Sequence, residues 1–273
     1  MDVNSVDTVL LPRTRAELPA WSPGTAVLGG GTWLFSEEQP DIHTLVDLTA
    51  LGWESLVVDA DGLHIAGTST IAALSRFGPP ADWRAGDLIA RCCEALLGSF
   101  KVHNAATVGG NICLALPAAP MIALAVALGG IATLWRADGG ERRLPVVDLV
   151  VGERRTALAE GEILRSVLLP RMALGRRFAF RQMSLTPLGV SAALLIGTRD
   201  RKGGFGLTLT AATSRPVRLE FASIPSPATL AARIDRAVGR PGLWQNDIHG
   251  DPAWRRQLSL VFAEEIRQEL SGA

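Results

Sequence analysis

Residues 101 to 112 constrain the fold of this chain more than any other stretch, because they place two adjacent glycines between polar residues and an apolar run. Gly109 and Gly110 lie between Thr107 and Asn111. Glycine has no Cβ, so the backbone N–H groups of such a turn can come close to a negatively charged ligand. The stretch is thus typical either of a tight structural turn or of an anion site.

A second glycine turn occurs early in the chain. Gly29, Gly30 and Gly31 follow a short apolar run at 25–28 and precede Thr32. The turn fits neither the Gly-x-Gly-x-x-Gly pattern of a dinucleotide-binding unit nor the Gly-Lys-Ser/Thr end of a Walker loop. Either turn alone is more typical of structure than of ligand binding. Together, with hydroxyl and amide donors nearby and little charge, they predict one diphosphate held from two sides.

The composition argues against several classes of function. The chain has 27 basic and 27 acidic residues, whereas proteins whose main partner is nucleic acid usually carry a basic excess. Cys92, Cys93 and Cys113 form no Cys-x-x-Cys pair and no even disulfide framework, which predicts buried, reduced thiols. Three cysteines are too few for an iron–sulfur cluster, and the four histidines are scattered, so we expect no metal site.

The location of the protein is predicted from two further features. No charged residue occurs from Asn104 to Trp135, but the longest uninterrupted apolar part, Met121 to Leu128, is shorter than the roughly 20 residues of a membrane span. The N-terminus carries Asp2 and Asp7 and lacks the basic region of a signal peptide. We expect a buried helix rather than a membrane span, and a cytoplasmic protein.

The apolar pattern predicts an α+β fold in three parts, 1–54, 55–170 and 171–273. The last part is expected to contain three antiparallel strands followed by two helices, separated from the middle part by a basic linker. Strands are expected at 25–28, 45–48, 56–58, 63–65, 131–135, 143–147, 162–170, 178–184, 191–198 and 205–213, and helices at 71–74, 87–97, 120–128, 227–238 and 251–269.

Catalytic residues are not evident in the sequence. No nucleophile elbow, catalytic triad or carboxylate pair stands out. His43 or Asp47 could act as a base in principle, although a surface histidine and a strand-end carboxylate are the more usual interpretations. If the protein is an enzyme, its chemistry is expected to belong to a cofactor.

Several segments occur in an order known from one family. Val102 to Asn111 is similar to Val-Arg-Asn-x-Ala-Thr-x-Gly-Gly-Asn and is the most specific match. The other matches are Val27 to Leu34, Leu45 to Leu48, Ile65 to Thr70, Pro117 to Ala119, Glu162 to Pro170 and Phe180 to Gln182. Over nearly its whole length the chain resembles the FAD-binding subunit of the molybdenum hydroxylases, the family of xanthine dehydrogenase and carbon monoxide dehydrogenase.

This resemblance implies a two-subdomain FAD-binding module of the PCMH or vanillyl-alcohol-oxidase type, followed by a C-terminal antiparallel sheet-and-helix domain of the carbon monoxide dehydrogenase flavoprotein type. It implies an FAD cofactor, iron–sulfur and molybdopterin partner subunits in a heterotrimer, and NAD, a quinone or oxygen as electron acceptor. The implied FAD contacts are Leu28, Gly29, Gly30, Gly31, Thr32, Trp33, Leu34, Leu97, Thr107, Val108, Gly109, Gly110, Asn111, Leu164 and Arg181.

The chain departs from the family pattern at a few positions of this implied site. Trp33 stands where a small or polar residue is usual, His103 replaces an arginine, and Pro120 replaces the aspartate of Pro-Ala-Ala-Asp. Arg181 stands for a flavin-contacting lysine, and the chain contains no tyrosine. Two hypotheses follow: an electron-transfer flavoprotein subunit, or a structural assembly subunit whose flavin site has degenerated. A stand-alone flavin oxidase is less favoured, because no acid–base residue for an organic substrate is evident.

Overall fold

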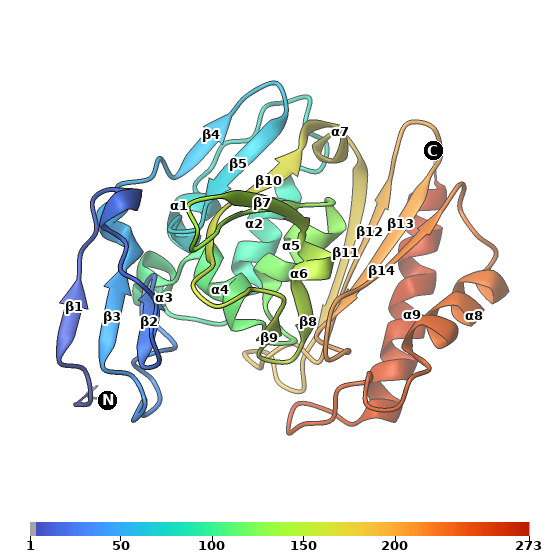
Figure 1. The fold of residues 1–273 in the computed structure, drawn as a ribbon. Coiled ribbons are helices and arrows are strands. Elements are labelled where there is room, and N and C mark those ends of the chain that lie inside the picture. The colour runs from blue at the N-terminus through green and yellow to red at the C-terminus, as the bar shows by residue number, and fades with distance from the viewer. Residues whose placement is uncertain (1–3, 273) are drawn as a thin grey trace.

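A computed structural model describes residues 4 to 272, and its strands form three main sheets that follow one another across the molecule (Figure 1). The N-terminal sheet lies at one end, the central sheet and most of the short helices lie in the middle, and the C-terminal sheet with two long helices lies at the other end. The predicted α+β fold is therefore correct. The predicted boundaries at 54/55 and 170/171 stay predictions.

The N-terminal sheet consists of three parallel strands in the order β1–β3–β2. The two strands expected here are found, and one short exposed strand, β1, was not predicted. Val46 and Leu48 are buried against Ile163 of the central sheet, so the first glycine turn, which follows β2, is held next to the rest of the molecule. The elements are β1 (Thr8–Leu10), β2 (Thr25–Leu28), β3 (Thr44–Asp47) and the 3-10 turns η1 (Arg15–Glu17) and η2 (Leu48–Leu51).

The central sheet is antiparallel, in the order β4–β5–β10–β6–β7, and is packed against short helices. Helix α5 is buried along its whole length, as its uncharged sequence predicts. The strands are β4 (Leu56–Val58), β5 (Gly62–Ala66), β6 (Ile131–Trp135), β7 (Glu141–Pro145) and β10 (Ile163–Pro170), with the small hairpin β8 (Val150–Gly152) and β9 (Arg155–Thr156). The helices are α1 (Ile71–Ser75), α2 (Asp87–Glu94), α3 (Phe100–Ala105), α4 (Val108–Leu114), α5 (Pro120–Ala127), α6 (Val146–Leu149) and α7 (Arg171–Leu174).

The C-terminal sheet has four antiparallel strands, one more than predicted, and two apolar faces. Because side chains alternate along a strand, Leu194 and Ile196 of β12 join the central core, whereas Leu195 packs with α8 and α9 on the opposite face. The elements are β11 (Arg177–Met183), β12 (Ala193–Arg199), β13 (Phe205–Thr210), β14 (Val217–Phe221), α8 (Pro227–Val238) and α9 (Pro252–Ser271). Among the described residues, no helix combines the length and the apolar character that a membrane crossing requires.

Candidate functional site

A cavity of about 680 Å³ lies where the three parts of the chain meet. Its walls come from the first glycine turn, the segment 95–97, helices α3 and α4, the start of β10 and the residues that enter β12. The volume lies within the range of pockets that enclose small organic ligands. The predicted site residues that line the cavity are Leu28, Gly29, Gly30, Gly31, Thr32, Trp33, Leu34, Leu97, Thr107, Gly109, Gly110, Asn111 and Leu164.

The first glycine turn presents unused backbone donors to this cavity. Phe35 N–H donates to the Gly31 oxygen at 2.9 Å and closes the turn. Among residues 4–272, no acceptor pairs with the backbone N–H groups of residues 30 to 33. A Cβ on Gly30 would lie 1.6 Å from the Ala105 oxygen, so the turn rests directly on the end of α3. Four neighbouring N–H groups without a protein acceptor form a cradle that suits an anion.

The second glycine turn differs, because its N–H groups are already used within the protein. Val108 and Gly109 N–H donate to the oxygens of Ser69 and Gly67, at 2.8 and 2.9 Å. Gly110 N–H donates to Thr107 Oγ1 at 3.0 Å, which caps α4, and Asn111 N–H donates to the Thr107 oxygen. The sequence predicted that N–H groups from both turns hold one diphosphate. In the structure the N–H groups of the second turn are not free for this, and that turn supplies a close-packed wall instead.

The side chains of Asn111 and Val108, both in the second turn, have different surroundings. Asn111 Oδ1 accepts from Met121 N–H at 3.0 Å, which leaves the Asn111 amide NH₂ for a ligand. Val108 is the one predicted FAD contact in this turn that does not line the cavity. Its side chain is buried in the central core.

Arg181 also lies outside the cavity wall. Its guanidinium pairs with Glu265 at 2.6 Å and Glu269 at 2.8 Å on α9, and hydrogen bonding to Glu265, then to Glu269, raises the pKa of Arg181. The neighbouring residues on β11 face the other way, since side chains alternate along a strand. Phe180 packs on the central core, and Gln182 Nε2 donates to Ser191 Oγ at 2.8 Å. Arg181 therefore faces α9 and is not on the described cavity wall, and its predicted FAD contact stays a prediction.

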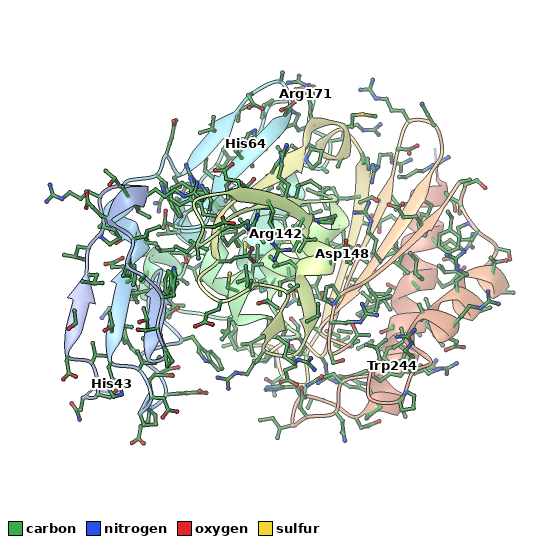
Figure 2. All side chains as sticks on the ribbon, in the orientation of Figure 1. His43, His64, Arg142, Asp148, Arg171 and Trp244 are labelled. Carbon is green, nitrogen blue, oxygen red and sulfur yellow. The ribbon has the colours of Figure 1, made fainter. Side chains whose placement is uncertain are left out.

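Several residues on the cavity wall are not among the implied FAD contacts, and three of them are polar or charged groups that bear on the site: Arg154, Glu162 and Ser191. Ser191 is buried beside Gln182, and the period of two along β11, which puts Gln182 on the same face as Phe180, is the signal that could have found this pair. Glu162 accepts two hydrogen bonds from Arg142, at 2.7 and 2.6 Å, and these hold the pKa of Glu162 below its usual value. Arg142, labelled near the middle of the molecule in Figure 2, thus balances the charge of Glu162, the only carboxylate on the described cavity wall.

The departures from the family pattern leave the cavity open. Trp33 lies on its wall, and the buried Nε1 of Trp33 has no hydrogen-bond partner among the described residues. His103 Nε2 lies 3.0 Å from the Leu96 oxygen and so ties α3 to the preceding loop. Pro120 is buried at the first position of α5. None of the three fills the space beside the first turn.

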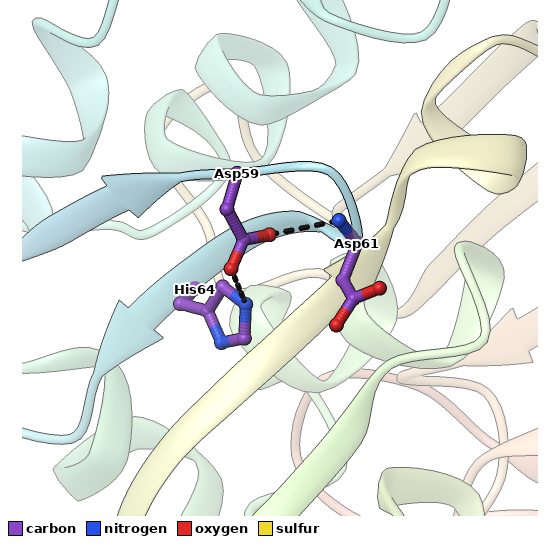
Figure 3. Close-up of side chains that lie close together, drawn as sticks. All are labelled: Asp59, Asp61 and His64. Atoms are coloured by element: carbon purple, nitrogen blue, oxygen red, sulfur yellow. Dashed lines mark hydrogen bonds and ion pairs between the residues drawn. The ribbon is translucent and has the colours of Figure 1, made fainter.

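Other chemically suggestive groups have structural explanations. Asp59, Asp61 and His64 lie together at the β4–β5 hairpin (Figure 3), where Asp59 accepts from Asp61 N–H at 2.9 Å and pairs with His64 Nε2 at 2.9 Å. His43 is exposed at the far end of the N-terminal sheet, and Asp47 accepts from Thr49 N–H in a 3-10 turn. These contacts fix turns, and the groups lie outside the cavity wall.

Comparison with known proteins gives this cavity a context. Residues 11–172 match the family described as the FAD binding domain in molybdopterin dehydrogenase. Caffeine dehydrogenase subunit beta from Pseudomonas sp. (strain CBB1) is 29% identical over 93% of this chain and 84% of its own length. Xanthine dehydrogenase from Oryza sativa is 31% identical over 48% of this chain, and the match spans only 9% of that much longer relative.

Solved structures share the whole fold. A reconstituted CO dehydrogenase from Oligotropha carboxidovorans aligns with a TM-score of 0.81 and 20% identity, covering 100% of both chains. Quinoline 2-oxidoreductase from Pseudomonas putida 86 aligns with a TM-score of 0.78 and 20% identity, covering 100% of this chain and 99% of that one. At this identity the likeness concerns the fold, including the C-terminal sheet beyond residue 172.

Proposed function

The chain belongs to the family of FAD-binding domains in molybdopterin dehydrogenases and has FAD as its cofactor; on this premise we propose that it is the electron-transfer subunit of a multi-subunit oxidoreductase. In this proposal it takes electrons from iron–sulfur clusters on a partner subunit and passes them to an external acceptor. A molybdopterin subunit would oxidise the substrate. Relatives that are named as subunits of dehydrogenase complexes support a role in such an assembly.

The residues present fit FAD. The N–H groups of residues 30 to 33 have no acceptor within residues 4–272 and suit the diphosphate, and Trp33 Nε1, which likewise has no partner there, offers a further donor. The Asn111 amide and the buried Leu164, which also line the cavity, would orient the isoalloxazine. When bound, FAD supplies the ability to accept and release one or two electrons. The chain contributes binding, orientation and an apolar wall that excludes water.

One observation supports the proposal above the others: residues 30 to 33, whose N–H groups have no acceptor among the described residues, line the same cavity as the apolar residues Leu164 and Leu97. A dinucleotide flavin needs both environments within one pocket, because its diphosphate is anionic and its ring system is largely apolar. The hypothesis of a degenerated structural subunit finds less support, since Trp33, His103 and Pro120 leave that pocket open.

FAD binding is tested by titrating the cofactor-free chain with FAD and following the quenching of flavin fluorescence. We expect one FAD per chain and a yellow protein after desalting. A colourless chain that takes up no FAD contradicts the proposal and favours a structural role.

The partners are tested separately, by isolating the complex through a tag on this chain. We expect it to carry iron–sulfur absorbance and molybdopterin. A chain that is isolated alone, with FAD but without either group, contradicts the proposed electron path while leaving FAD binding intact.

A further inference from the structure

Arg154 occupies a strained turn at the cavity wall. It lies between β8 and β9 with φ +53°, and its N–H donates at 3.0 Å to the oxygen of Ala115, which also has φ +53°. Positive φ is unfavourable for residues other than glycine and persists where the surroundings enforce it. The bond to Ala115, at the end of α4, therefore fixes the position from which the Arg154 side chain extends.

The side chain extends over the segment that follows the first glycine turn. The guanidinium carbon lies 5.8 Å from the centroid of the Trp33 ring, and Nη2 lies 3.8 Å from Glu37 Oε2. Both side chains of this ion pair are about half exposed, at 56% and 46%, and such pairs contribute little energy. No hydrogen-bond acceptor contacts the guanidinium among the described residues. The N–H donors of the guanidinium therefore remain available to a ligand.

The charged residues on the cavity wall differ in how well each is paired with an opposite charge. Among the described residues that line the cavity, only Arg154 and Glu162 carry charge. Glu162 is matched by Arg142 through two hydrogen bonds, whereas the one charged partner of Arg154 within residues 4–272 is Glu37, at 3.8 Å. The wall thus keeps one poorly matched cation, which stacks on Trp33, the last residue of the N–H cradle.

We propose that Arg154 is the phosphate-recognising cation of this site, and that it exchanges Glu37 for a phosphoryl group of the bound dinucleotide. A guanidinium donates two parallel hydrogen bonds to phosphate oxygens, which a carboxylate at 3.8 Å does not receive. Arg154 then gives the cavity its preference for a diphosphate-bearing flavin over riboflavin, and Glu37 is an internal competitor. This inference rests on the proposed FAD-binding function.

The test measures binding of FAD, ADP and riboflavin to the cofactor-free chain by calorimetry at two salt concentrations. R154Q is expected to weaken FAD and ADP about tenfold, the scale of one lost charge-assisted contact, to leave riboflavin unchanged and to reduce the salt dependence. E37Q is expected to tighten FAD about threefold. R155Q is the matched control, because Arg155 is exposed next to Arg154 at the start of β9 but does not line the cavity, and its affinities stay at the wild-type values.

A second variant separates binding from folding. R154G relieves the positive φ, so its melting temperature is expected not to fall, while its FAD affinity drops as in R154Q. The inference is overturned if R154Q binds FAD and ADP as tightly as the wild type does. It is also overturned if R154Q loses as much affinity for riboflavin as for FAD. If the wild-type chain binds ADP in an Arg154-dependent way but no FAD, only the proposed function fails. If it binds neither, both fail.

Discussion

The two glycine turns look alike in the sequence but differ in what they offer a ligand. Residues 30 to 33 keep four N–H groups without acceptors among the described residues, whereas residues 108 to 111 have all four N–H groups bonded within the protein. The second turn starts helix α4 and is joined to the segment 67–69, while the first follows the end of β2 and starts no helix. A glycine pair therefore indicates close approach, and only the hydrogen bonds show whether a ligand or the protein makes use of it.

This comparison also distinguishes what each turn contributes. In the second turn, a Cβ on Gly109 would lie 2.5 Å from the Gly67 oxygen, so its glycines permit two protein segments to pack. In the first turn, Gly30 packs against Ala105, and the residues whose N–H groups lack acceptors line the cavity. We therefore expect substitutions in the first turn to act mainly on cofactor affinity and substitutions in the second to act mainly on stability.

The largest effect is expected for Gly30→Ala. Its Cβ would meet the Ala105 oxygen at 1.6 Å, so the turn has to move away and its N–H donors lose their common direction. FAD affinity is expected to fall more than about 100-fold, the scale of two lost charge-assisted hydrogen bonds, in a fluorescence titration. Gly78→Ala is the control, since its Cβ would meet nothing within 4 Å. Unchanged FAD affinity of the Gly30 variant breaks the comparison.

Arg142→Met tests whether Glu162 is a structural charge. It leaves a carboxylate that is 4% exposed without its partner, and about 2 kcal/mol of unfolding free energy is expected to be lost at pH 7. This is below the range for fully buried pairs, because the Arg142 side chain is 35% exposed.

The pH dependence of that variant gives a sign to check. Arg142 lowers the pKa of Glu162 in the folded chain, so the pair stabilises above the unfolded pKa of about 4.3 and loses this effect as pH falls through the folded value. The difference between wild type and variant, measured by urea unfolding, is expected to shrink from pH 7 towards pH 3. A difference that grows on acidification contradicts the assignment.

A smaller effect separates the hydroxyls of the two turns. Thr107→Val removes the acceptor of Gly110 N–H and is expected to cost about 1 kcal/mol of stability. Thr32 is exposed at the cavity, so Thr32→Val is expected to leave the melting temperature unchanged and to weaken FAD about threefold. The reverse pattern, with stability lost at Thr32 and not at Thr107, contradicts the division between the turns.

The smallest effect concerns the neighbours on β11. Gln182→Ala removes the hydrogen bond that holds the Ser191 hydroxyl at the cavity wall. FAD affinity is expected to fall about threefold. Arg181→Ala is the matched control, because its guanidinium pairs with α9, and FAD affinity is expected to stay unchanged. A loss confined to the Arg181 variant restores the original sequence assignment.

The sequence predicted the fold further than it predicted the site. Local patterns located most elements, since a buried helix such as α5 and a hairpin such as β4–β5 are encoded by nearby residues. The cavity residues were found where a contiguous motif carries them. Arg154 and Ser191 were missed because their role depends on contacts with Trp33 and Gln182, more than a hundred residues away in one case. The orientation of Arg181 depended on which face of β11 meets α9, which spacing alone left open.

Amide hydrogen exchange in the free and FAD-bound chain tests the contrast between the turns most directly. We predict that the amides of residues 30 to 33 exchange rapidly without FAD and become protected when FAD binds, because FAD then supplies their acceptors. Amides 108 to 111 are predicted to be protected in both states. Protection of residues 30 to 33 before FAD is added, or no change on its binding, contradicts the account.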